Sequence, residues 1–360
     1  MNQLHTDPAA TAGQHLQQFD HFPEALLEVP ASELWRHLPS PALFSITGRR
    51  PEPIFVSVLL HGNEDTGWRA IQNVLRQFRN AALPRSLLLF VGNIEAARAG
   101  VRTLPDQQDY NRAWPGTPDP DTALARFLSN VVGLVRQRAP FASIDIHNNS
   151  GRNPHYVCVS RLAEPHLHLA RLFSRTVVYF ERPLGVQSAA LAQLCPAVAI
   201  ECGRAGESAG IEHAAELVES VLALQHFPEH SIPDHDLDLL RTMAIVKVPP
   251  QASFSVDGTP ADFQFRPDLD HLNFSELESG TSFGTLGNDR SQRLEVAPTH
   301  DRAPRDGYFS YAGREIRLSR PAIPAMLTLD QRAVRLDCLG YLMQRIGRDG
   351  QPLKERGIAP

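Results

Sequence analysis

Short apolar segments alternate with longer amphipathic segments through most of the first 235 residues. The short segments are rich in Ile, Val, Leu and Phe and cover residues 54–60, 87–91, 143–146, 156–159, 176–180 and 197–200. Their length and their Gly, Pro, Asn or Asp borders predict β-strands. The longer segments are expected to be helices and cover residues 68–78, 121–136, 164–174 and 211–225. In the first of them Ile71, Val74 and Phe78 are three and four positions apart, as one face of a helix requires.

Strands that alternate with helices predict an α/β fold, with a mostly parallel sheet flanked by helices. Prolines interrupt the residues before this pattern, where 24–38 is expected to hold one or two short helices. After residues 228–238 the pattern changes to short alternating runs separated by Gly, Pro and Asp turns. We therefore expect an α/β domain at residues 1–235 and a smaller β-rich domain at 236–360. The closing segment 330–348 is expected to return as a helix against either domain.

Composition narrows the class of protein. The chain has 360 residues, of which 42% are hydrophobic and 21% charged, as in an ordinary globular protein. Its longest apolar runs are about a third of the ~20 residues that a membrane helix needs, and the N-terminus lacks a secretory pattern. The net charge of −5 lacks the basic surplus that is typical of proteins that bind nucleic acid. The four cysteines are scattered and include no CxxC pair, which favours reduced thiols. We expect a cytoplasmic protein that binds neither membranes nor nucleic acid. The sequence is compatible with a homo-oligomer.

Polar residues follow three predicted strands where each strand ends. His61 and Glu64 follow the first strand, His147 follows 143–146, and Glu201 follows 197–200. Loops at the carboxyl ends of parallel strands converge on one crevice, so these side chains are expected to meet.

The HxxE spacing of His61 and Glu64 occurs four times in the chain, the others starting at His21, His213 and His226. Those three lie in the proline-interrupted leader or in or next to a helical segment, where a solvated surface is the simpler interpretation. At His61 the pair follows a strand, and Gly62 allows the tight turn that aims both side chains at one point.

Two His and one Glu, with a water in the fourth position, form a known catalytic zinc set. We therefore predict one Zn²⁺ per chain, held by His61, Glu64 and His147, although His147 taken alone is more typical of a core or loop histidine. Asp145 lies two residues before His147, on the same strand face. It is expected either to accept the second ring proton of the ligand or to serve a buried cap or salt bridge.

Four ordered motifs carry a resemblance to a known family: His61-Gly-Asn-Glu64, Asp109-Tyr-Asn111-Arg112, Asp145-Ile-His147-Asn and Ile200-Glu201-Cys-Gly203. Over about residues 50–230 the sequence resembles the succinylglutamate desuccinylase and aspartoacylase family, which belongs with the zinc carboxypeptidases. The β-rich tail fits the smaller C-terminal domain of that family.

The resemblance implies zinc on His61, Glu64 and His147, and Glu201 as the catalytic carboxylate. It also implies that Asn111 and Arg112 hold a substrate carboxylate. An arginine shortly upstream is implied for the oxyanion, best matched by Arg102, with Arg98 as the rival. A plain surface arginine is the alternative for Arg102 and Arg112.

These roles predict a zinc-dependent hydrolase that cleaves an amide bond next to a free carboxylate. The substrate is expected to be a small N-acyl amino acid, with a short peptide cut by a metallocarboxypeptidase as the alternative. Glu201 would take the proton of the attacking water and pass it to the leaving amine. The guanidinium of Arg112 suits bidentate binding of a carboxylate.

One position departs from the family pattern. Aspartoacylase-like enzymes carry an arginine about ten residues before the catalytic glutamate, for an acidic substrate side chain, and Leu191 stands there. The apolar stretch 189–194 favours a neutral substrate side chain, unless Arg152 or Arg182 replaces the missing charge. Tyr308 and Tyr311 have no assigned counterpart among the substrate-contacting residues of the family.

Two other classes compete with this interpretation. Gly206-Glu-Ser208-Ala-Gly210 matches the GxSxG motif of serine hydrolases, but a nucleophile elbow needs a strand that runs almost directly into the serine. Ser208 is therefore expected to be a helix cap or loop residue. A non-catalytic zinc-binding protein on the same fold is the other alternative, although such a protein would not need Glu201.

Overall fold

The computed structural model describes residues 15–300 and 307–353. They form two compact units, each assembled from separate parts of the chain. The first unit comprises the described part of Met1–His147 with Leu184–Ala197 and Ala215–Leu224. The second comprises Asn148–Pro183, Val198–Ala214 and the described part of the chain from Gln225 onward.

The first unit contains a sheet whose strands lie in the order β1-β2-β4-β3-β5. Their bounds are β1 (Gln17–Phe19), β2 (Ala42–Ile46), β3 (Gly48–Val58), β4 (Leu83–Val91) and β5 (Ala142–Asn149), the last continuing into the second unit. The central strand β3 pairs in parallel with both β4 and β5, whereas β2 pairs antiparallel with β4. Val58 is level with Val91, and Ser57 with Asp145, so β3 and β4 end together and β5 continues past them to Asn149.

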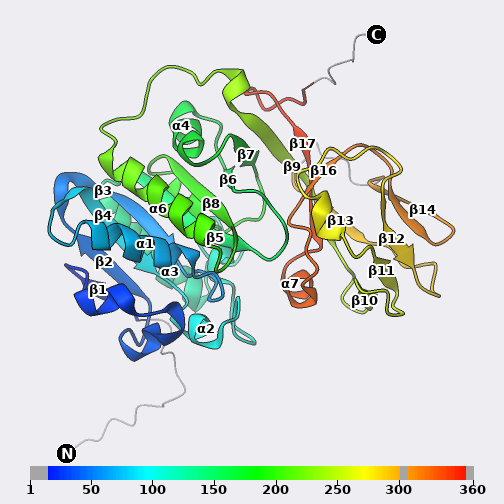
Figure 1. Cartoon of the computed structure of the whole chain (residues 1–360), viewed down its shortest axis with the longest axis horizontal. Helices are drawn as coiled ribbons and strands as arrows, with labels where there is room; N and C mark the ends of the chain where they lie inside the picture. The colour runs from blue at the N-terminus through cyan, green and yellow to red at the C-terminus, as the bar shows by residue number, and fades with distance from the viewer. Residues whose placement is uncertain (1–14, 301–306, 354–360) are drawn as a thin grey trace, which may run out of the picture. The chain divides into compact units, whose positions relative to one another are not determined.

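The helices of this unit follow from amphipathic segments and short turns. They are η2 (Glu24–Glu28), η3 (Ala31–Arg36), α1 (Thr66–Gln77), α2 (Ile94–Ala99), η4 (Tyr110–Arg112), α3 (Ala123–Gln137) and α5 (Gln187–Leu191). At Gly67 in α1 a Cβ atom would lie 2.9 Å from side-chain carbons of Val58 and Ile146. This close approach sets the start of α1 against β3 and β5 (Figure 1).

A hydrophobic core fills the first unit around Trp114, which is fully buried. The rings of Phe55 and Phe90 pack edge-on against it, with ring centroids 6.5 and 5.8 Å away. Because Phe55 lies on β3 and Phe90 on β4, this core fixes both strands that lead into the loops described below.

The second unit has a mixed sheet of order β8-β6-β7-β9-β17-β16, with β13 paired to β9. Its strands are β6 (Tyr156–Val159), β7 (Thr176–Tyr179), β8 (Ala197–Arg204), β9 (Asp238–Lys247), β13 (Glu295–Pro298), β16 (Ile323–Ala325) and β17 (Gly340–Arg345). The pairs β6–β7 and β7–β9 are parallel, and β6–β8 is antiparallel. The helices are α4 (Glu164–Phe173), α6 (Ser208–Ala223, which continues into the first unit), η5 (Asp234–Asp236), η6 (Leu269–Leu272) and α7 (Gln331–Leu336).

A separate five-stranded sheet has the order β10-β11-β12-β15-β14. Its short strands are β10 (Phe254–Ser255), β11 (Phe263–Phe265), β12 (Ser282–Leu286), β14 (Phe309–Ala312) and β15 (Glu315–Leu318). Figure 1 shows most of them in yellow and orange. The fold prediction is confirmed: mostly parallel strands flanked by helices, with an additional β-rich region.

The six predicted strands correspond to β3–β8, and the four predicted helices to α1, α3, α4 and α6. Residues 330–348 differ, since α7 is followed by the strand β17 instead of one long helix. Residues 340–343 are all buried, and a continuous apolar run does not separate a buried strand from a helix. Residues after 235 contribute both to the mixed sheet and to the five-stranded sheet, and the functional division into 1–235 and 236–360 stays a prediction.

None of the helices in the described residues combines the length and the apolar character needed to cross a bilayer.

Candidate active site

The turn after β3 carries the first two site residues. Leu59 has a φ of +55° and begins the turn, and the backbone N–H of Glu64 donates to the His61 carbonyl at 3.2 Å. A Cβ atom at Gly62 would lie 2.1 Å from the carbonyl carbon of Ala96 on α2, so only glycine fits. The packing of this turn on α2 therefore places His61 and Glu64 side by side.

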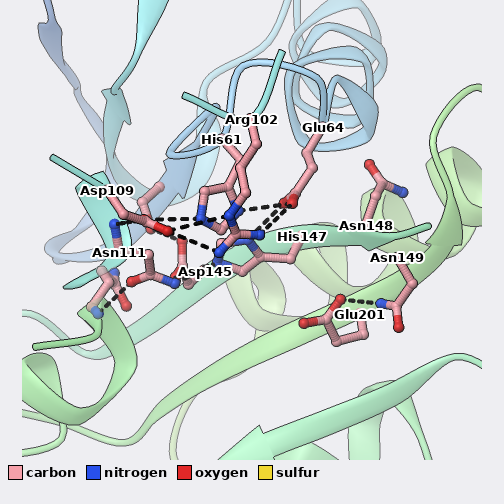
Figure 2. Close-up of polar contacts among 12 residues, drawn as sticks. His61, Glu64, Arg102, Asp109, Asn111, Asp145, His147, Asn148, Asn149 and Glu201 are labelled. Atoms are coloured by element: carbon pink, nitrogen blue, oxygen red, sulfur yellow. Dashed lines mark hydrogen bonds and ion pairs between the residues drawn. The ribbon is translucent and has the colours of Figure 1, made fainter. Parts of the chain in front are cut away.

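The third site residue, His147, extends from β5 next to that turn. Its Nδ1 lies 2.8 Å from Glu64 Oε2, and Nδ1 of His61 lies 2.8 Å from Glu64 Oε1 (Figure 2). One ligand atom from each residue lies within 4.8 Å of the others, and all three residues are buried. The structure thus brings together the three predicted metal ligands.

A carboxylate holds the opposite side of each imidazole. Asp145 Oδ2 lies 2.7 Å from Nε2 of His147, and Asp109 Oδ1 lies 3.1 Å from Nε2 of His61. Ser57 donates to the other oxygen of Asp145 at 2.6 Å, which fixes that carboxylate. Carboxylates placed in this way keep the proton on Nε2 and turn the Nδ1 lone pair toward the centre.

This arrangement suits a cation between the two rings and Glu64. A neutral imidazole with its proton on Nε2 would direct a lone pair at a carboxylate oxygen, and those two groups repel unless a positive charge lies between them. Burial would raise the pKa of Glu64, but His61 and His147 outweigh burial and hold it well below its ordinary value. Burial would lower the pKa of His147, but Asp145 and Glu64 raise it well above its ordinary value. Two imidazole nitrogens and a carboxylate are the donor set that zinc accepts.

Arg102 lies beside the proposed ligands. Its Nη2 donates to Asp109 Oδ2 at 2.9 Å, and its Nη1 lies 3.7 Å from Glu64 Oε1. Arg98 instead places its guanidinium carbon 4.1 Å from the ring centroid of Trp35. Of the two predicted candidates, Arg102 is therefore the one that lies next to the proposed metal ligands.

Asn111 and Arg112 lie in the short helix η4. The Asn111 side chain is buried, accepts the Gln187 backbone N–H at 2.9 Å and approaches His147 Nε2 at 3.1 Å with its Nδ2. Arg112 is half-buried, and one Nη1 bond goes to the Asn111 carbonyl at 2.8 Å. Asn111 is thus part of the network around His147, which the sequence does not reveal.

Glu201 lies on β8 in the second unit and is half-buried. The Asn149 side-chain amide donates to its Oε2 (Figure 2). Asn149 is the last residue of β5, two positions after His147. The sequence alone indicates no role for either Asn149 or Asp109, although Asp109 begins one of the four motifs and Asn149 directly follows another.

Leu191, Arg152 and Arg182, which bear on substrate selectivity, have different environments. Leu191 is fully buried in the core around Trp114. Arg152 and Arg182 are exposed, and Nη1 of Arg152 lies 2.8 Å from Nε2 of His271.

Tyr308 and Tyr311 pack in the core of the β-rich region. Tyr308 is buried, and the Tyr311 hydroxyl accepts the backbone N–H of Leu294 at 3.0 Å. The hydrogen bond accounts for the Tyr311 hydroxyl, whereas the buried Tyr308 hydroxyl has no hydrogen-bond partner among the described residues.

The GxSxG match at Ser208 has a packing explanation. Gly206 has a φ of +86°, and a Cβ at Gly210 would lie 2.1 Å from the Cys202 carbonyl oxygen, where α6 packs on β8. Ser208 is exposed at the start of α6 and, in the described part of the chain, forms no hydrogen bond with a histidine. The two glycines of the motif therefore serve the turn and the contact between helix and strand.

Residues 54–227 match the family model described as the succinylglutamate desuccinylase/aspartoacylase catalytic domain. No curated protein matches the sequence.

Solved structures of similar fold cover most of the chain. The succinylglutamate desuccinylase from Chromobacterium violaceum is 15% identical, with a TM-score of 0.55 over 83% of this chain and 86% of that chain. The succinylglutamate desuccinylase/aspartoacylase from Rhodobacter sphaeroides is 15% identical, with a TM-score of 0.56 over 84% and 88%. Murine aminoacylase 3 is 14% identical, with a TM-score of 0.52 over 83% and 97%. The chain is thus similar to the catalytic domain of the succinylglutamate desuccinylase/aspartoacylase family over residues 54–227, and the solved structures of that family share its fold.

Proposed function

We propose that the chain is a zinc-dependent hydrolase that cleaves the amide bond of N-acyl amino acids next to a free carboxylate. The observation that carries this proposal is the convergence of two imidazole Nδ1 atoms on the two oxygens of Glu64, each at 2.8 Å. Proteins of similar fold include succinylglutamate desuccinylases and an aminoacylase, which supports the choice of acyl amino acids.

One zinc ion held by His61, Glu64 and His147 would supply a Lewis acid that lowers the pKa of a bound water from 15.7 to about 7. The protein's own groups prepare the centre for that ion. Asp145 and Asp109 hold the outer ring nitrogens, so the two imidazoles are oriented before any metal binds. Arg102 compensates part of the charge of the carboxylates around it.

Glu201 is the proposed general base and acid. It would accept a proton from the attacking water and transfer it to the nitrogen of the leaving amine, a role typically worth about 10²–10⁴ in rate. Arg102 is the proposed donor to the oxyanion that forms on the amide carbonyl, and one such donor is typically worth ~3 kcal/mol of barrier. Arg112, assisted by Asn111, is the proposed holder of the substrate carboxylate, because its planar guanidinium pairs with two carboxylate oxygens.

The test compares zinc-loaded and metal-free protein on N-acyl amino acids and on dipeptides, each with a free or an amidated C-terminal carboxyl group. We expect zinc-dependent hydrolysis of N-acyl amino acids with a free carboxylate. Faster hydrolysis of dipeptides would favour a metallocarboxypeptidase. Bound zinc without turnover of any substrate would favour a binding protein, and full turnover by metal-free protein would refute the proposal. A serine hydrolase would lose nearly all turnover in Ser208→Ala, which we expect to stay active.

A further inference from the structure

The second unit holds a polar contact on Glu201 that the proposed reaction does not yet use. Asn149 donates its side-chain Nδ2 to Glu201 Oε2, and both residues belong to strands, β5 and β8. Asn149 is 6% exposed, so water hardly competes for this contact. A hydrogen bond between a buried amide and a carboxylate on two strands restricts the position of the carboxylate.

The amide of Asn149 has one orientation that the charges allow. Its Oδ1 is buried and has no partner in the described part of the chain. Turning the amide over would place Oδ1 against the Glu201 carboxylate and set two oxygens in repulsion. Buried acceptors usually have a hydrogen-bond partner, so the unpaired Oδ1 of Asn149 requires an explanation. It stays unpaired because this orientation of the amide lets Nδ2 donate to Glu201.

Neighbouring strands keep the pair in place. Tyr156 on β6 is directly opposite Glu201 in the antiparallel β6–β8 ladder, and its hydroxyl lies beside the Asn149 amide. The Tyr156 ring packs on Phe274, with ring centroids 4.7 Å apart. Side chains alternate along a strand, so Asn149 also projects from the same face of β5 as His147. Asn149 thus links the strand of a proposed metal ligand to the proposed general base.

We propose that Asn149 is a positioning residue that holds the Glu201 carboxylate in its reactive orientation. This inference rests on the proposed function, in which Glu201 moves the proton. A glutamate side chain has three rotatable bonds, and misplacement of a catalytic group by about 1 Å is enough to cost about 100-fold in rate. Asn149 acts only through Glu201, so its removal affects turnover and not the binding of substrate or metal.

The test is a double-mutant cycle on the zinc-loaded full chain, with kcat, KM, zinc content and Tm measured for every variant. We expect Asn149→Ala to lower kcat by about 10–100-fold with KM changed by less than about threefold and zinc retained. Added to Glu201→Gln, the same change is expected to cause no further loss, because the group it positions is already disabled. Asn149→Thr, which keeps a hydroxyl donor, is expected to recover part of the lost kcat.

Asn153→Ala is the matched control. Asn153 lies shortly after β5, and its Oδ1 accepts the Met326 backbone N–H at 2.9 Å, a contact remote from Glu201 in the chain. We expect it to lower Tm while kcat stays within about twofold. An unchanged kcat in Asn149→Ala, or an equal further loss in the Glu201→Gln background, would overturn the positioning role. A Glu201→Gln variant as active as the wild type would refute the role of Glu201 itself, which is a failure of the proposed function.

If Asn149→Ala fails to fold, Asn149→Thr decides the question through the same cycle. A kcat loss that disappears in the Glu201→Gln background supports the inference, and a loss of equal size in both backgrounds contradicts it.

Discussion

Nδ1 of His147 lies 2.8 Å from Oε2 of Glu64, although 83 positions separate the two residues in the sequence. The parallel pairing of β3 with β5 makes this contact, because it ends both strands at the same edge of the sheet. The turn at Gly62 then returns Glu64 toward β5. The proposed metal centre is therefore a product of strand register and of one glycine that cannot be replaced.

Replacing His147 by Ala is expected to remove bound zinc and to reduce turnover to background. His147 supplies one of three proposed ligands, and two ligands do not hold zinc tightly. Elemental analysis of the purified variant checks the metal, and the N-acyl amino acid assay checks turnover. His21→Ala is the matched control, since His21 also has a glutamate three positions later but is exposed. Zinc retained at one ion per chain in the His147 variant would remove this residue from the ligand set.

Asp145→Asn is expected to weaken zinc binding by about 10–100-fold, the usual effect of losing the carboxylate behind a ligand histidine. The asparagine keeps the shape of the side chain but no longer carries the charge that orients the ring at 2.7 Å. Competition with a chelator of known affinity measures the change. Ser57→Ala, which removes only the 2.6 Å hydrogen bond to Asp145, should have a smaller effect. Equal zinc affinity in wild type and Asp145→Asn would show that Asp145 serves only the packing of β5.

Glu201→Gln is expected to keep zinc and to lose about 10²–10⁴ in turnover, the range of general acid–base catalysis. Zinc content and kcat measured on the same preparation separate the two properties. Glu207→Gln, on an exposed residue of the turn before α6, is the control and should retain turnover. Loss of zinc together with activity in Glu201→Gln would mean that Glu201 is a ligand and that the assignment of Glu64 is wrong.

His166 on α4 makes the folded chain sensitive to acid. Its two ring nitrogens are buried without hydrogen-bond partners among the described residues, and burial, with the nearby charge of Arg161, lowers its pKa from 6.5 to about 4. The unfolded chain therefore takes up this proton first as the pH falls. Protonation of His166 therefore does not affect the free energy of unfolding above pH 6.5. As the pH falls from 6.5 toward 4, this group lowers the free energy of unfolding by at most about 3 kcal/mol.

Denaturant unfolding of wild type and His166→Leu at several pH values isolates this contribution. We expect the difference in the free energy of unfolding between the two proteins to change with pH between 6.5 and 4, in favour of the leucine variant at low pH. A difference that is constant over this range would exclude His166 as the source.

The fold and the positions of the proposed metal ligands are predictable from sequence for a local reason. His61 and Glu64 lie in the turn after β3 and His147 lies near the end of β5, so strand prediction alone places the three residues at one edge. The partners Asp109 and Asn149 are different, because their contacts join residues 48 and 52 positions apart without a local pattern. Such contacts depend on tertiary packing, which neither spacing nor residue type encodes.

Hydrophobicity also misleads where a segment is buried on all sides. Residues 340–345 pair with β9 as the strand β17 and contribute Leu342 and Met343 to the interior. The helical period that we expected for 330–348 is present only in the six residues of α7. A short apolar run is compatible with both structures, and the partner strand decides between them.

Substrate preference gives the last prediction. The family arginine ten positions before Glu201 is replaced by Leu191, which is fully buried in the core around Trp114. An acidic substrate side chain would have to leave water without a matching cation, which is costly in a partly buried site. We therefore expect N-acyl amino acids with neutral side chains to be hydrolysed with a higher kcat/KM than N-acetylaspartate or N-succinylglutamate.

The comparison uses substrates that share one acyl group and differ only in the amino acid side chain, each also tested as its carboxyl amide. The amides are expected not to be hydrolysed, because Arg112 would have no carboxylate to bind. Arg112→Lys should lower the hydrolysis of the free acids toward the level of the amides, since lysine lacks the planar guanidinium group. Amides cleaved as fast as the free acids would contradict the role of Arg112. A preference for N-acetylaspartate would instead point to Arg182 or Arg152 as the source of the missing charge, and Arg182→Gln and Arg152→Gln would then identify which of the two provides it.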